Sequence, residues 1–277
     1  MRTRAPPDRR ALGRTESRPL QRGGSSAGLQ RGIRHDGTMT DVPDLDLDRR
    51  AATVVRALPR LEGDERRIGR AIYQLMAAGR RVRTSALSAL TGCDAARVDE
   101  VLGHLPTAAV VDGEVMAFLG LQRATGRHQL AFADARLATW CAWDTLFIPP
   151  LAGRAARAES RCPVTGRRIA VDVDPDRGVV AISPDSAVLS FLAAPDPFTG
   201  DVISGFCRWI HFLADTSAGE AWLAGGDDPV GERPAMILLR PEEGFALGER
   251  TNRALFGPAL DAPHAARPVP QARCLPG

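Results

Sequence analysis

Two cysteines and one aspartate stand out in this 277-residue chain, because their side chains suit a site that binds a soft metal ion and moves a proton. Cys141 and Asp144 lie three residues apart in the run T-W-C-A-W-D, and Cys207 lies in a second apolar run, G-F-C-R-W-I-H. The thiolate is the form of cysteine that binds metals, and a nearby carboxylate can take the thiol proton. A carboxylate in apolar surroundings has a raised pKa, so it can also return that proton near neutral pH.

Each cysteine also has an ordinary structural interpretation. Cys141 could be a core thiol next to an acid at a solvated helix edge, and Cys207 taken alone is typical of a core cysteine. Cys207 and His211 have the C-x₃-H spacing of half a zinc site, but no second ligand pair matches it. Cys162, in C-P-V-T-G, resembles half a zinc knuckle without its C-x-x-C partner, so we expect a structural thiol at the start of a hairpin.

The composition is that of a globular protein. Hydrophobic residues make up 44% and charged residues 25% of the chain, and no apolar run reaches the roughly 18–20 residues of a membrane span. Five widely spaced cysteines argue against a disulfide framework. We therefore expect reduced thiols in a cytoplasmic protein with no membrane partner.

The net charge of +3 is unevenly distributed. Residues 1–40 carry nine Arg and three acidic residues, a balance of +6, so the remainder is at +3 − 6 = −3. A slightly acidic body argues against nucleic acid as a partner. We expect residues 1–40 to be a disordered Arg/Gly-rich extension, with Met39 as a candidate start; a basic nucleic-acid-binding or transit tail is the alternative.

The elements that must hold the candidate site can be predicted from hydrophobic periodicity. We expect a helix that begins at Asp134, carries Cys141 and Asp144 on one face, and ends at Pro149 and Pro150. Strand-like runs interrupted by Gly, Pro or Asp, an apolar segment holding Cys207 and a C-terminal helix complete the body. The expected strands lie within 115–133, within 158–194 and at 235–239. The apolar segment is 205–214, and the C-terminal helix runs from Glu242 or Glu243 to Leu255.

The region before this body has the pattern of a winged helix-turn-helix. Three helices are expected, followed by a hairpin turn at Asp112-Gly113. The expected helices are Arg67–Gly79, a second one capped by Thr84 or Ser85 and stopped at Gly92, and a third from Asp94 to Leu105. The third helix carries Asp94, Asp99 and Glu100 against Arg97. Phosphates would repel this acidic helix, so we expect the module to pack against the body rather than to read DNA.

The predicted fold class is therefore α+β. A winged-helix-like module, residues 41–118, packs on a mixed catalytic domain of short antiparallel strands and helices, residues 119–257. Residues 258–277 are expected to form a flexible Pro/Ala/Arg-rich tail.

The chain resembles the alkylmercury lyase family from about Arg66 to Leu255. The match is densest in L-A-T-W-C-A-W-D-T-L, Leu137 to Leu146, and continues through G-R-A-A-R-A-E-S-R-C-P-V-T-G. It returns in S-G-F-C-R-W-I-H-F-L-A and in E-G-F-A-L-G-E-R-T-N-R, Glu243 to Arg253. The family often has another cysteine directly after the one matched by Cys207, where this chain has Arg208.

The resemblance implies a catalytic trio of Cys141, Asp144 and Cys207, with Cys162 structural. The implied reaction is protonolysis of a carbon–mercury bond, which gives a hydrocarbon and mercury(II). One thiolate, expected to be Cys141, captures the organomercurial, and Asp144 takes the proton of Cys207. Mercury(II) then binds both sulfurs, with an oxygen of Asp144 as a further candidate ligand. Asp144 then protonates the carbon. No cofactor is implied, but cellular thiols are needed for turnover, and a mercuric reductase is the expected acceptor of mercury(II).

Two alternatives use the same thiols. One is a winged-helix transcriptional regulator that senses a metal, and the other is a relative that binds mercury without cleaving the bond. The first predicts specific, salt-dependent DNA binding, and the second predicts capture without hydrocarbon release.

Overall fold

The computed structural model describes residues 46–193, 202–225 and 234–261. The described residues belong to one compact unit. Within these ranges no helix is both long and apolar enough to cross a membrane. The expected extension at 1–40 and most of the expected C-terminal tail lie outside the described residues.

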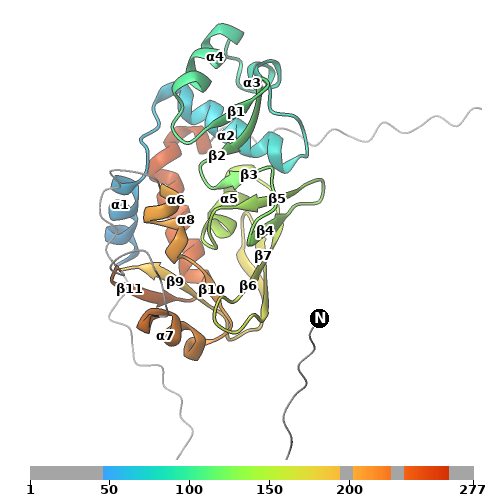
Figure 1. Ribbon diagram of the computed structural model, residues 1–277. Coiled ribbons are helices and arrows are strands. Elements are labelled where there is room, and N and C mark those ends of the chain that lie inside the picture. The colour runs from blue at the N-terminus through green and yellow to red at the C-terminus, as the bar shows by residue number, and fades with distance from the viewer. Residues whose placement is uncertain (1–45, 194–201, 226–233, 262–277) are drawn as a thin grey trace, which may run out of the picture. The chain divides into compact units, whose positions relative to one another are not determined.

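The described chain is a mixture of helices and antiparallel sheets, which confirms the α+β class (Figure 1). The α-helices are α1 (Leu47–Ala57), α2 (Gly63–Ala77), α3 (Thr84–Thr91), α4 (Ala95–His104), α5 (Asp144–Ala152), α6 (Val202–Gly205), α7 (Thr216–Ala224) and α8 (Pro241–Phe256), with 3₁₀ turns η1 (Cys207–Trp209) and η2 (Gly257–Leu260). The start of the expected tail is thus ordered, and Arg70 donates to the carbonyl of Ala259 within it.

The main sheet has eight strands in the order β1-β2-β3-β5-β4-β6-β7-β8, and every pair is antiparallel. A smaller antiparallel sheet has the order β10-β9-β11. The strands are β1 (Ala109–Val111), β2 (Glu114–Phe118), β3 (Leu121–Gln122), β4 (His128–Ala131), β5 (Arg136–Thr139), β6 (Ala156–Arg161), β7 (Arg168–Asp174), β8 (Gly178–Ser183), β9 (Val188–Leu192), β10 (Phe212–Leu213) and β11 (Met236–Leu239). Alternation of buried and exposed residues along β6 and β7 reflects a sheet with one face on the core.

The pair α5 and α8 positions the candidate site. Gly244 and Gly248 lie one turn apart on α8, and a methyl group at Gly248 would come within 2.6 Å of Phe147 Cβ on α5. Two buried hydrogen bonds join the helices, from Trp143 Nε1 to the Gly244 carbonyl at 2.9 Å and from Asn252 Nδ2 to the Phe147 carbonyl at 2.8 Å. The motif E-G-F-A-L-G-E-R-T-N-R therefore brings α8 into close contact with residues 143–147, the segment that carries Asp144.

The three expected helices and the hairpin occur as predicted, as α2, α3, α4 and β1–β2, and they are preceded by α1, which was not predicted. Asp112 and Gly113 both have positive φ, 51° and 69°, as the type I′ turn of a two-residue hairpin requires. The expected cap of the second helix is wrong: Arg83 occupies the cap position, and the hydroxyl of Thr84 instead bonds Asp99 at 2.5 Å. The winged-helix assignment and the boundary at residue 118 stay predictions, since β2 continues into β3 of the same sheet.

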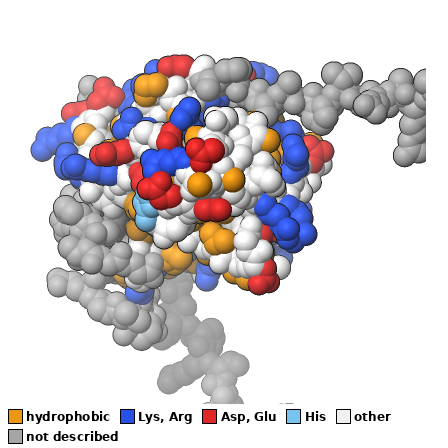
Figure 2. Space-filling model, turned by 90° about the horizontal axis from the view of Figure 1, so that it is seen from above, with side chains coloured by type: hydrophobic (Ala, Val, Ile, Leu, Met, Phe, Trp, Pro, Cys, Tyr) orange, Lys and Arg blue, Asp and Glu red, His pale blue; other side chains and the backbone are white. Residues whose placement is uncertain are grey.

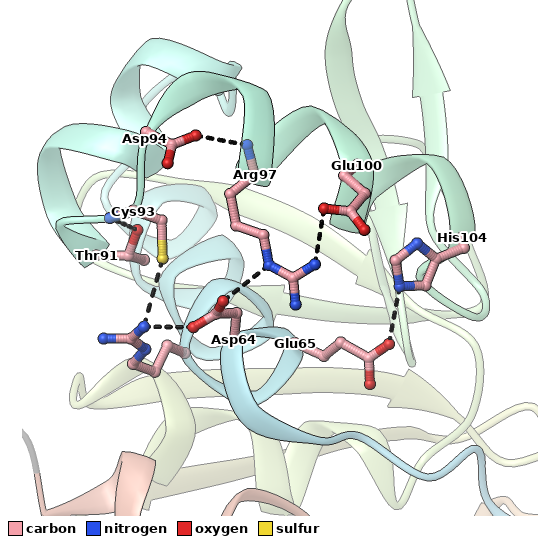
Figure 3. Close-up of polar contacts among 9 residues, drawn as sticks. Asp64, Glu65, Thr91, Cys93, Asp94, Arg97, Glu100 and His104 are labelled. Atoms are coloured by element: carbon pink, nitrogen blue, oxygen red, sulfur yellow. Dashed lines mark hydrogen bonds and ion pairs between the residues drawn. The ribbon is translucent and has the colours of Figure 1, made fainter.

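Charged side chains of α4 form ion pairs with neighbouring residues of the protein (Figure 3). Arg97 donates to Asp64 on α2 and to Glu100, each at 2.8 Å, and His104 lies 3.1 Å from Glu65. Figure 2, which looks down on this end of the molecule, shows Arg and acidic side chains intermixed over the surface. Such a surface lacks the continuous positive field that attracts nucleic-acid phosphates.

Candidate active site

Cys141 and Asp144 lie close together, but not for the reason expected. The predicted helix from Asp134 is wrong, because residues 136–139 form β5, which pairs with both β3 and β4. The chain bends after β5, and Asp144 is the first residue of α5, whose Pro149 and Pro150 lie inside the helix before Gly153 ends it. The backbone N–H of Cys141 donates to Asp144 Oδ2 at 2.7 Å across this bend.

Cys207 reaches the same place from the η1 turn. The backbone N–H of Ala142 donates to the Ile210 carbonyl at 3.2 Å, which joins the two cysteine-bearing segments. One sulfur from each cysteine and one oxygen of Asp144 all lie within 4.8 Å of one another, in the one such group of three metal-binding side chains among the described residues. The three residues are buried, with Cys141 at 0%, Cys207 at 3% and Asp144 at 4% exposure. The structure thus brings together all three predicted site residues.

Burial sets the protonation states of this group. Desolvation raises the pKa of the Asp144 carboxyl to about 7, although hydrogen bonds from Cys141 and from the Trp140 backbone lower it. Desolvation also raises the pKa of the Cys141 thiol well above its usual value, and its neighbours Cys207 and Asp144 raise it further. At neutral pH the Cys141 sulfur therefore carries its proton, and it stands beside a carboxyl that is close to half-protonated.

A small cavity reaches part of this group. Its volume is about 10 Å³, about the room of one water molecule. Asp144 and Cys207 line it, together with Gly120, Trp140 and apolar side chains, whereas Cys141 is not among its described lining residues. The cavity is therefore a small pocket that a carboxyl and one thiol both line.

Two positions beside the site were missed by sequence reasoning. Gly120 was interpreted only as a strand interruption, but its φ is +91° and a methyl group there would lie 2.8 Å from Asp144 Cγ. Tyr73, the single tyrosine of the chain, is fully buried and its hydroxyl donates to the Leu119 carbonyl at 2.6 Å. Burial, and secondarily the charge of Asp144, raises the pKa of Tyr73. No local pattern signals either role, because both depend on contacts distant in sequence.

The other candidate ligands do not join the group. His211 lies within hydrogen-bond distance of the Arg208 carbonyl, at 2.9 Å, and its ring stacks on His128 with centroids 5.5 Å apart. Cys162 is buried at the turn between β6 and β7, where its sulfur accepts the Thr165 N–H at 3.4 Å. The turn position predicted for Cys162 is confirmed.

Comparisons with known proteins agree with this geometry. The model of the family described as alkylmercury lyase matches residues 122–251. An alkylmercury lyase of Bacillus cereus is 32% identical over 179 residues, which cover 65% of this chain and 78% of the relative. The chain belongs to the alkylmercury lyase family. A family member from Pseudomonas putida is 35% identical over 170 residues, covering 61% of this chain and 76% of the relative.

A solved structure supports the fold. The crystal structure of the mercury-bound form of MerB2 aligns with a TM-score of 0.54 and 21% identity, covering 76% of this chain and 98% of that one. Membership of the family confirms the predicted resemblance and disfavours the transcriptional regulator.

Proposed function

We propose that the protein cleaves the carbon–mercury bond of organomercurials by protonolysis, using Cys141, Cys207 and Asp144. The observation that carries the proposal is the buried group of two sulfurs and one carboxylate oxygen within 4.8 Å. Mercury(II) is a soft ion that prefers thiolate ligands, and a carboxyl with a pKa of about 7 can accept and return a proton near neutral pH.

The order of the steps follows from access to the cavity. Cys207 lines the cavity and Cys141 is completely buried, which favours capture by Cys207 first, the reverse of the order expected from the resemblance. In this step the Cys207 sulfur replaces the group X of R–Hg–X, and its proton leaves as HX.

The second thiol then completes the reaction. Asp144 takes the proton of Cys141, the Cys141 sulfur binds mercury, and Asp144 delivers that proton to the carbon. The carbon–mercury bond breaks, R–H leaves, and mercury(II) stays on two thiolates while Asp144 is again ionised. General acid catalysis of this kind contributes typically about 10²–10⁴-fold.

The proposal includes the mercury carriers. External thiols remove mercury(II) from the two sulfurs, because ligand exchange between thiolates needs no redox change. A mercuric reductase is the acceptor that would consume the released ion. The need for reduced cysteines places the reaction in a reducing compartment such as the cytoplasm.

Methane release tests the proposal. Reduced protein with methylmercury and excess thiol is expected to release methane into the headspace with repeated turnover. A folded, reduced sample that binds methylmercury but releases no gas would instead identify a mercury-binding relative without lyase activity.

A further inference from the structure

The two thiols of the site are carried by different sheets. Cys141 follows β5 of the eight-stranded sheet, whereas Cys207 lies in the η1 turn that leads into β10 of the three-stranded sheet. One ion can bind both sulfurs only if the η1 turn is held at a fixed place. The contacts of this turn therefore decide whether Cys207 can share an ion with Cys141.

The η1 turn depends on partners outside itself. It contains three residues, Cys207–Trp209, and a hydrogen bond from the Ile210 N–H to the Cys207 carbonyl at 3.2 Å closes it. So short a helix is unstable without tertiary contacts. A helix end leaves its last carbonyls to be satisfied from outside the helix, and those of Arg208 and Trp209 accept hydrogen bonds from side chains.

Ser190 bonds one of these carbonyls from the central strand of the small sheet. Its hydroxyl donates to the Trp209 carbonyl at 2.8 Å and accepts the backbone N–H of His211 at 3.0 Å. Ser190 is completely buried in β9, whose run V-L-S-F-L is otherwise apolar. A buried hydroxyl is costly unless it is hydrogen-bonded, and here it bonds the segment that follows Cys207.

His211 bonds the other carbonyl. Its Nε2 lies 2.9 Å from the Arg208 carbonyl and carries the proton of this bond, because a carbonyl oxygen only accepts. The imidazole stacks on His128 with centroids 5.5 Å apart, and it lies edge-to-face with Trp222 at 4.8 Å. These ring contacts restrict rotation of the imidazole, so Nε2 stays directed at the turn.

We propose that Ser190 and His211 are positioning residues for Cys207, which hold the η1 turn so that the Cys207 sulfur shares mercury with Cys141. The inference rests on the proposed lyase function and adds two residues that act through the backbone of the turn. Its physical basis is preorganisation, because displacement of a reacting group by about 1 Å can cost about 10²-fold in rate.

Removal of the two side-chain bonds tests the proposal. In a Cys93→Ser, Cys274→Ser background, Ser190→Ala and His211→Leu are each expected to lower kcat for methane release at least about tenfold. Retention of one equivalent of mercury(II) against a competing monothiol should fall as well, because one thiolate holds the ion less firmly than two. The one-to-one methylmercury adduct needs a single thiolate and should still form.

Two further variants separate positioning from general loss of stability. His211→Gln keeps an N–H donor near the place of Nε2 and should recover most of the mercury(II) retention that His211→Leu loses. Ser186→Ala is the matched control, because the Ser186 hydroxyl donates to the Ala214 carbonyl at 2.9 Å, at the other end of the β9–β10 pair. It should retain both kcat and mercury(II).

The outcomes separate the two proposals. Unchanged mercury(II) retention in both Ser190→Ala and His211→Leu, or an equal loss in Ser186→Ala, would overturn the positioning role. Equal losses in His211→Gln and His211→Leu would overturn the part assigned to His211. Unaltered protein that retains mercury(II) but releases no methane would overturn the lyase function alone, since retention still measures positioning. Circular dichroism of each variant shows that the compared samples are folded.

Discussion

The carboxylate of Asp144 accepts the backbone N–H of Cys141 at 2.7 Å, inside a site where both residues are almost completely buried. This contact holds the carboxylate beside the thiol that it deprotonates in the proposed mechanism. Burial outweighs the hydrogen bonds that Asp144 accepts, so its pKa is raised to about 7.

The two cysteines are expected to have unequal roles. In a Cys93→Ser, Cys274→Ser background, Cys141→Ser should still form a one-to-one methylmercury adduct, because Cys207 faces the cavity. Cys207→Ser should form it much more slowly, and both variants should lose turnover by at least about 10²-fold. Mass spectrometry under limiting thiol measures capture, and the reverse pattern of capture would contradict entry through Cys207.

Asp144→Asn is expected to abolish proton delivery and to change the pH dependence of stability. The folded pKa of about 7 lies above the ordinary aspartate value of 3.8. Between these values the folded protein retains a proton that the unfolded chain has released, so the free energy of unfolding falls as pH rises and the full penalty is present above pH 7. The penalty is roughly 4 kcal/mol.

Denaturant melts of both proteins at several pH values measure this effect. Asp144→Asn should gain stability relative to the unaltered protein as pH rises from about 4 to about 7. A stability difference that does not depend on pH would show that the Asp144 pKa is ordinary.

The pH profile of activity should have an acidic limb set by the same carboxyl. The ionised form of Asp144 is needed to take the Cys141 proton, so kcat/KM should fall below about pH 7 as the carboxyl with that pKa is protonated. Initial rates of hydrocarbon release between pH 5 and 9, the range chosen around this limb, measure it. An acidic limb near pH 4 would argue for a solvated carboxylate.

Gly120→Ala is expected to impair the site without removing any functional group. The added methyl would lie 2.8 Å from Asp144 Cγ and Oδ1, and the φ of +91° is strained for any L side chain. We expect a loss of about 1–3 kcal/mol in stability and a larger proportional loss of kcat than of methylmercury capture. Gly113→Ala, with positive φ but open space around it, is the control for backbone strain alone and should retain kcat.

Tyr73→Phe is expected to destabilise the segment around Gly120, but less than Gly120→Ala does. The variant removes the hydroxyl that donates to the Leu119 carbonyl at 2.6 Å. Leu119 directly precedes Gly120 in the sequence. Loss of one such buried hydrogen bond costs about 0.5–1.5 kcal/mol, with a further penalty for the carbonyl left without its partner. Thermal unfolding measures this cost, and an unchanged melting temperature would show that the bond is replaced.

The residue types and their local order determined much of this protein. The thiols, the carboxylate, the α2–α4 helices, the hairpin at Asp112 and the last helix all follow from motifs and periodicity, since capping, turn and amphipathic signals act over a few residues. The same local signals misplaced Cys141. A spacing of three residues fits one helical face as well as a strand, a bend and a helix start, and only pairing of β5 with β3 and β4 decides between them.

Tertiary structure decided the chemistry of the site. A backbone hydrogen bond between Ala142 and Ile210 joins the segment of Cys207 to that of Cys141. The space for the Asp144 carboxylate depends on the absence of a side chain at Gly120. The sequence alone places an acid near a thiol. Folding removes that acid from water, and desolvation of the charged form is what raises its pKa to about 7.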